Sequence, residues 1–196
     1  MTTRRWTGPV PPGATETPVD PLPALQKVLK GRKLPTVAVV VPEEHIGRTA
    51  VAMADPAVET EIKRLLLTCG VKIKDLKQNE LADWTRDVGQ DAAEPWPRSL
   101  TGVDLVVTGE AFSEFTAQMG NLISCSARAE MNVISRKDGR IVQTDRVTTR
   151  AVDLAQNTAG RMALQKAGRV MAIRVLQYLV ETAPQREGQH VEDDES

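Results

Sequence analysis

Two hydrophobic periods alternate along the chain and predict alternating strands and helices. Residues 36–42, TVAVVVP, form a β-branched run closed by proline, which predicts a strand buried on both faces. Residues 43–54 show no clear period and predict a loop. A helix is expected from the N-cap Asp55 and the first-turn Pro56 to a stop at Gly70, because apolar residues follow at helical spacing: Val58, Ile62, Leu65, Leu66 and Cys69.

The next segment predicts a strand, a helix and a loop. Residues 71–76, VKIKDL, alternate as a short strand does. Residues 77–88 return to helical spacing, and residues 89–101 are rich in Pro, Asp and Glu, which favours a loop. The first half therefore permits a parallel crossover pair of strands.

The second half predicts an antiparallel meander. Residues 103–113 are strand-like, and about eight residues, 114–121, join them to a near-ideal alternating strand over 122–134. Its two faces differ: Ile123, Cys125, Ala127, Ala129, Met131 and Val133 on one, and Ser124, Ser126, Arg128, Glu130 and Asn132 on the other. Lys137-Asp138-Gly139 predicts a hairpin turn because glycine readily adopts a positive φ, and residues 140–149 return antiparallel.

A long helix is expected after the meander. Asp153 is its predicted N-cap, with Gln156 as the capping-box partner. Seven positions spaced by four form an apolar stripe that suits close packing on a sheet: Ala155, Ala159, Ala163, Ala167, Met171, Val175 and Leu179. The element order β-α-β-α-β-β-β-α predicts an α/β (α+β) fold with a mixed sheet, in which the long C-terminal helix packs on the meander.

Charge divides the chain into three parts. Residues 1–35 carry six basic and two acidic residues and are dense in proline up to residue 23, which predicts a Pro-rich N-terminal arm. Residues 36–182 hold the periodic elements and predict one domain, whose balanced charge argues against nucleic acid as a partner. Residues 183–196 include Glu192-Asp193-Asp194-Glu195 and predict an acidic disordered tail.

The start of the chain contains no secretory signal pattern, because no apolar run follows Arg4 and Arg5. The sequence contains no run of about 18 apolar residues, so no transmembrane helix is predicted. The protein is expected in the periplasm or at the outer-membrane periphery if an upstream signal is missing, and otherwise in the cytoplasm. Cys69 and Cys125 are each expected to be small buried hydrophobes, and a disulfide between them stays open.

Few residues predict chemistry. No spacing typical of a zinc, phosphate-binding or nucleophilic site occurs, so no catalytic, cofactor-binding or metal-binding residue is predicted. His45, beside Glu44, is the one place for an enzyme or small-molecule site. Glu110 and Glu114 would lie about 13 Å apart along a strand, too far for a glycosidase pair. Glu110 is instead expected to pair across strands with Arg128 or Arg146.

Three strings carry a resemblance to a known group: VDLVVTGEAFSEF from residue 103, NLISCSARAEMNVISRKDGRIV from residue 121 and VDLAQNTAGRMALQKAG from residue 152. They resemble the CsgG-like and TolB-N-terminal-like domains of bacterial envelope proteins. That group includes the curli assembly component CsgG, the flagellar ring protein FlgT and the penicillin-binding-protein activator LpoB. The resemblance covers roughly residues 36–182, and the connection 114–121 is too short for an inserted amphipathic hairpin of the curli pore type.

The resemblance implies a non-enzymatic domain that docks on other envelope proteins, with a homo-oligomer as a further possibility. The alternatives are a regulator of a cell-wall synthesis enzyme and, second, a small-molecule binder or enzyme that uses the loop around His45. The candidate interaction residues are Trp6, Arg128, Glu130 and Arg146. Trp6 is either a solvent-exposed residue or an anchor that orders on binding. An unprotected edge of the meander could also pair with another subunit.

Overall fold

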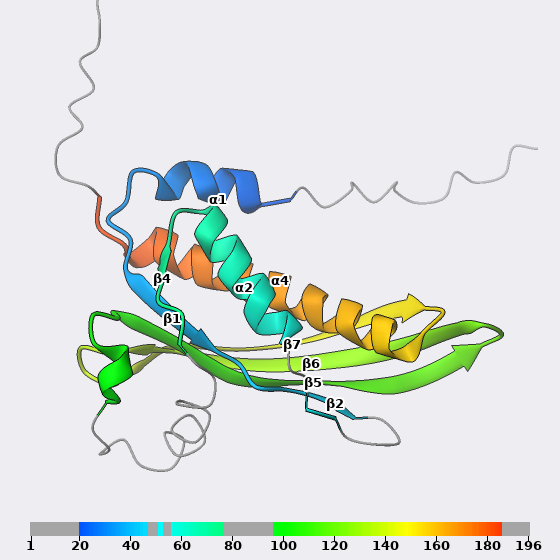
Figure 1. The fold of residues 1–196 in the computed structure, drawn as a ribbon. Helices are drawn as coiled ribbons and strands as arrows, with labels where there is room; N and C mark the ends of the chain where they lie inside the picture. The colour runs from blue at the N-terminus through cyan, green and yellow to red at the C-terminus, as the bar shows by residue number, and fades with distance from the viewer. Residues whose placement is uncertain (1–19, 47–50, 53–55, 77–95, 186–196) are drawn as a thin grey trace, which may run out of the picture.

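The computed structural model describes residues 20–46, 51–52, 56–76 and 96–185 as one mixed sheet with its α-helices on one face (Figure 1). The strands are β1 (Thr36–Val40), β2 (Glu43–Ile46), β3 (Val51–Ala52), β4 (Lys72–Ile73), β5 (Leu105–Met119), β6 (Leu122–Ser135) and β7 (Ile141–Asp153). The helices are α1 (Leu22–Leu29), α2 (Ala57–Thr68) and α4 (Gln156–Thr182), with the short 3-10 helix η1 (Arg98–Leu100). The predicted α/β (α+β) class, the mixed sheet and the terminal helix over the meander are confirmed.

Strand β5 is the centre of the sheet. One edge of it pairs in parallel with β1 and then with β2, and the other edge pairs antiparallel with β6, which pairs in turn with β7. Strand β4 pairs in parallel with β1 after helix α2, which is the predicted crossover. β1 and β2 follow one another along β5 and are separated only by Val41 and Pro42, because proline has no N–H to continue the ladder.

The expectation of a loop over residues 43–54 is wrong. Residues 43–46 form β2 and residues 51–52 form β3, which pairs antiparallel with β2. The sequence EEHI lacks a clear strand pattern, but its backbone meets the free edge of β5 in parallel register from Ala111 to Glu114. Pairing with a distant strand therefore overrides a weak local preference.

The connection expected over residues 114–121 is also different. β5 continues to Met119, and the turn to β6 contains only Gly120 and Asn121, with Gly120 at φ +58°. A bulge between Phe115 and Ala117 shifts the register of the pairing with β6. The second turn lies where it is predicted, with Gly139 at φ +70°.

Helix α4 packs its small side chains on the sheet as the stripe predicts. The six stripe residues from Ala159 to Leu179 are at most 1% exposed, whereas Ala155 is exposed. The predicted cap is wrong: Ala155 occupies the N-cap position, and Asp153 ends β7. The Asp153 carboxylate accepts the Ala155 N–H at 3.1 Å and so bonds the strand–helix connection instead of the helix.

Helix α1 lies within the segment predicted as a Pro-rich arm. Leu29 is fully buried, and Leu22 and Leu25 pack against the main core, so the folded part begins before residue 36. Figure 1 shows α1 above the end of α4 that is farthest from the β5–β6 turn. Trp6, the helix expected over 77–88 and the Glu192–Glu195 run lie outside the described residues.

Candidate functional site

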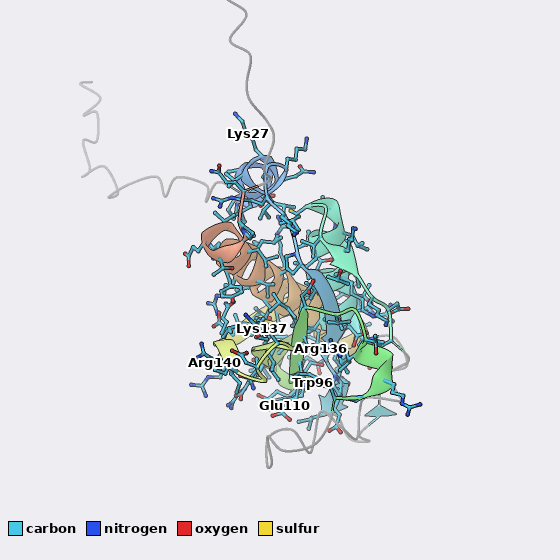
Figure 2. The ribbon with its side chains drawn as sticks, turned by 90° about the vertical axis from the view of Figure 1, so that its left-hand side faces the viewer. Lys27, Trp96, Glu110, Arg136, Lys137 and Arg140 are labelled. Carbon is cyan, nitrogen blue, oxygen red and sulfur yellow. The ribbon has the colours of Figure 1, made fainter. Side chains whose placement is uncertain are left out.

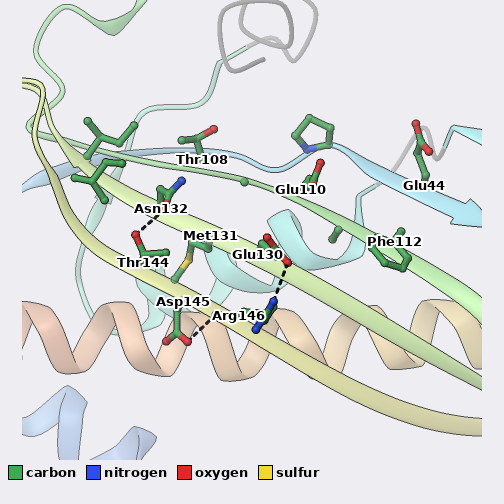
Figure 3. Close-up of a pocket in the computed structure, with 15 residues that line it drawn as sticks. Glu44, Thr108, Glu110, Phe112, Glu130, Met131, Asn132, Thr144, Asp145 and Arg146 are labelled. Carbon is green, nitrogen blue, oxygen red and sulfur yellow. Dashed lines mark hydrogen bonds and ion pairs between the residues drawn. The ribbon is translucent and has the colours of Figure 1, made fainter. Parts of the chain in front are cut away.

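The face of the sheet that points away from α2 and α4, here called the outer face, holds the candidate site. Part of it is covered by a small apolar cluster of Ala38, Val40, Leu100, Val103 and Val106, with Leu76 and Trp96 packed against it. Beside this cluster, β5, β6 and β7 line an open hollow of about 860 Å³ (Figure 3). Figure 2 shows Glu110 on this side of the sheet, opposite Lys27 of α1.

Three of the four predicted interaction residues meet on the outer face. Arg128 and Glu130 are two residues apart on β6 and therefore share a face, and Arg146 is the register partner of Glu130 on β7. Arg128 Nε donates to Glu130 Oε1 at 2.7 Å, and Arg146 Nη1 lies 3.8 Å from the same oxygen. Figure 3 shows Arg146 of β7 directed at Glu130 of the neighbouring strand β6.

These ion pairs are too exposed to contribute much to folding. The side chains of Arg128, Glu130 and Arg146 are 43%, 39% and 66% exposed. Exposed pairs of this kind contribute about 0–1 kcal/mol. The charges are therefore available to a partner that removes them from water.

The expectation that Glu110 pairs across strands with Arg128 or Arg146 is wrong. The register places Glu110 directly opposite Glu130, and both arginines turn to Glu130. Glu110 makes no ion pair with any described residue. Like charges on directly opposed positions destabilise a sheet slightly, so this arrangement does not serve the fold.

The free edge of β7 is partly closed. The Arg146 N–H donates to Asp145 Oδ1 at 2.8 Å, and the Arg146 carbonyl accepts a hydrogen bond from Arg174 Nη1 at 3.2 Å. The Arg150 carbonyl accepts Lys166 Nζ at 3.0 Å. Side chains that occupy edge groups oppose pairing with a further strand, so the outer face is a better candidate than this edge.

His45 lies in β2, not in a loop, and it is half-buried. Its Nδ1 is 2.6 Å from Ser113 Oγ, and its Nε2 is 3.5 Å from the Gln156 side-chain nitrogen. A Cβ atom on Gly160 of α4 would lie 2.7 Å from His45 Cε1, so the ring packs directly on the helix backbone.

This histidine–serine pair resembles a nucleophile and its base, but the hydroxyl cannot be reached by a substrate. Ser113 is 0% exposed. Glu44, the nearest acidic neighbour in sequence, lies on the opposite side of β2, since successive residues of a strand alternate between faces. Ser113 belongs to no recognisable sequence motif. The alternation of β5 was the available signal, because it places Ser113 on the inner face with the buried Ala111.

Two buried carboxylates were missed by the sequence analysis. Glu43 of β2 accepts the N–H groups of Ala57 at 2.8 Å, of Val58, and of Glu59 at 3.3 Å, and so caps α2 from a strand. Pro56 occupies the N-cap position, and the expected cap Asp55 lies outside the described residues. Burial raises the pKa of Glu43 to about 7, although the three N–H groups act in the opposite direction.

The second buried carboxylate connects three elements. Glu59 Oε2 accepts the Val41 N–H at 2.9 Å, at the break between β1 and β2. Its Oε1 pairs with Lys63 Nζ at 2.8 Å, and Lys63 also bonds Asp75 at 2.6 Å. Glu43 and Glu59 are therefore structural groups that hold α2 against the sheet.

Both cysteines are buried and free, as small hydrophobes are expected to be. Burial raises the pKa of the Cys69 and Cys125 thiols, which disfavours the reactive thiolate. The described residues contain no group of three metal-ligating side chains. Among the same residues, no helix has the length and apolar character needed to cross a bilayer.

The sequence matches no family model and no curated protein sequence. Solved structures do resemble the chain. The hypothetical protein CT253 from Chlamydia trachomatis has 19% identity and a TM-score of 0.48, over 74% of this chain and 98% of that one. A minor lipoprotein from Acinetobacter baumannii has 11% identity and a TM-score of 0.41, over 77% and 97%. The PelC dodecamer from Paraburkholderia phytofirmans has 15% identity and a TM-score of 0.40, over 70% and 88%.

Proposed function

We propose that this chain is a non-enzymatic protein-interaction and assembly domain of the bacterial cell envelope, in the periplasm or at the outer-membrane periphery. The observation that carries the proposal is the outer face of β5–β7, an open hollow lined by charged side chains that contribute little to the fold. The motif strings that resemble CsgG-like and TolB-N-terminal-like domains support the envelope role. The enclosed Ser113 hydroxyl is one reason to prefer binding over catalysis.

Arg128, Glu130 and Arg146 are the residues that meet the partner. Arg128 and Arg146 share the single carboxylate of Glu130. A partner that brings a second carboxylate would form a charge-assisted hydrogen bond with one arginine, and the other arginine would keep Glu130, so no cation would be buried unpaired. Charged groups on an open face mainly set the partner's identity and the rate of encounter. Loss of one of these charged side chains should therefore lower the rate of association with the partner more than it lowers the stability of the fold.

Photo-cross-linking in the native host tests this proposal. Thr148 is exposed and lies beside Arg128 on the outer face, so a photoreactive residue at this position should cross-link a partner protein. The same probe at Gln177, which is exposed on α4, is the matched control. Arg146→Glu should reduce the cross-link at Thr148, and Lys33→Glu, the same change of charge on another exposed residue, should not.

The possible outcomes distinguish the candidate roles of the chain. Cross-links to a cell-wall synthase would make the chain a regulator of that enzyme, within the proposed class. Equal cross-linking from Thr148 and Gln177 would contradict a role for the outer face. Fractionation of the same cells tests the compartment, because a protein found only in the cytosol would contradict the envelope role.

A further inference from the structure

The geometry points to a second copy of this chain as the partner of the outer face, in a twofold dimer whose axis runs parallel to β6. This inference rests on the proposed function, since it names the partner of the same surface. Three observations carry it: two columns of opposite charge, their common levels across the sheet, and an apolar end.

The charges of the outer face lie in two columns on either side of β6. On β5, Glu110 and Glu114 alternate with Phe112, so all three point to one face. On β7, Arg146 and Arg150 have the same spacing of four residues and both are exposed. The face is therefore acidic on one side of β6 and basic on the other.

The two columns are level with each other. Glu130 pairs with both Glu110 and Arg146, and Ser126 pairs with both Glu114 and Arg150. Within one copy, the backbones of each carboxylate and its arginine are two strand spacings apart, about 10 Å, and Arg146 approaches the nearer Glu130 instead of Glu110.

These charges also lack strong partners in the part of the chain that the structure describes. Among the described residues, Glu110, Glu114 and Arg150 make no ion pair, and Arg146 approaches Glu130 only to 3.8 Å. Three of the four are therefore exposed without a charged partner among these residues, and a partner surface could bind those three without breaking an existing ion pair.

A twofold rotation parallel to β6 is the face-to-face arrangement that pairs these columns. It exchanges the two sides of the face and keeps the levels, so β5 of one copy lies over β7 of the other. Glu110 then faces the second copy's Arg146, Glu114 faces its Arg150, and both contacts occur twice. An axis across the strands would instead place the β5 carboxylates of the two copies over one another. With the axis along β6, Glu130 of one copy meets Glu130 of the other, and each is already paired with Arg128 of its own chain.

The same rotation places the apolar end of each face against the other. Met119 and Leu122 are register partners beside the β5–β6 turn, and Val152 pairs with Ser124 one level further along. Met119 is 79% exposed, Leu122 50% and Val152 52%. Exposed apolar side chains that adjoin charged groups on one face are a feature of interaction surfaces.

Sedimentation velocity with charge-reversal variants tests this dimer. The native chain should show a concentration-dependent dimer that weakens at high salt, because exposed ion pairs are screened. Glu110→Arg with Glu114→Arg, or Arg146→Glu with Arg150→Glu, should each raise the dissociation constant at least about tenfold through like-charge contacts. Lys27→Glu with Lys30→Glu, at exposed positions in the last turn and the C-cap of α1, is the matched control and should leave the dimer intact.

Mixing the two outer-face variants gives the decisive result. Each reversed column then faces a complementary column, and the remaining native columns also face each other, so a one-to-one heterodimer should form. Far-ultraviolet circular dichroism confirms that each variant is folded. A native chain that stays monomeric at every concentration, or a mixture that fails to dimerise, would overturn the inference.

The two proposals fail in different ways. A monomeric chain that still cross-links another protein from Thr148 would overturn the dimer and leave the interaction function in place. A monomer with no specific cross-link from Thr148 would overturn both.

Discussion

Glu43 makes the stability of this protein depend on pH in a direction unusual for a helix-capping carboxylate. Its burial raises the pKa from 4.5 to about 7. Between these values the folded state holds a proton that the unfolded state has released, so the free energy of unfolding falls as pH rises. The pKa difference of about 2.5, at about 1.36 kcal/mol per unit, corresponds to about 3 kcal/mol lost between pH 4.5 and 7.

The opposite result is physically possible and would refute the reasoning. Three N–H groups and the positive end of the α2 dipole favour the ionised carboxylate. If these contributions exceeded the cost of burial, the pKa would lie below 4.5 and stability would rise with pH toward neutrality. The sign of the pH dependence therefore decides which contribution is larger.

Urea denaturation from pH 4 to pH 8 measures this sign. We expect the stability of Glu43→Gln relative to the native chain to rise by about 3 kcal/mol across the range, because the amide does not ionise. Glu44→Gln removes a carboxylate from the exposed side of the same strand and is the matched control. A Glu43→Gln profile parallel to that of the native chain would contradict the assignment to Glu43.

Three further predictions concern the packing of α4. Gly168→Ala should destabilise the fold by about 1–3 kcal/mol in urea, since the new Cβ would lie 2.8 Å from the Val58 carbonyl oxygen of α2, and an unchanged midpoint would contradict this contact. Ala167→Leu should cost a similar amount, about 1–3 kcal/mol, by overpacking a position that is 0% exposed, and an unchanged melting temperature would refute its placement. His45→Ala should lower stability by about 1–3 kcal/mol because the buried Ser113 hydroxyl loses its partner, whereas a ligand-induced thermal shift lost in this variant would favour the small-molecule alternative.

Local sequence patterns were sufficient to predict the strands, helix and turn whose hydrophobic period or turn residues are clear in the sequence. The strict alternation of β6 predicts both its length and its buried face, because the period of two depends only on the backbone. The stripe of α4 and the turn at Gly139 are local in the same sense. Arg128, Glu130 and Arg146 could be selected from the sequence because they lie on the polar side of such strands.

Long-range pairing determined the remaining features. β2 has no strong strand pattern and exists because β5 offers it a free edge in parallel register. Glu43 becomes a buried cap only when that strand is brought to the start of α2. Ser113 and His45 are 68 residues apart, and no local signal predicts their contact.

The register of the outer face shows most clearly what the sequence alone determined and what it did not. The sequence by itself determined which residues share this face, since alternation assigns Glu110, Glu130 and Arg146 to polar sides of their strands. The turn at Gly120 alone would place Glu110 opposite Met131, but the bulge after Phe115 shifts the pairing by one residue and places it opposite Glu130. Only the tertiary structure decided that carboxylates oppose each other on β5 and β6 and that arginines lie level with them on β7, because a bulge depends on packing between strands and not on the period of either one.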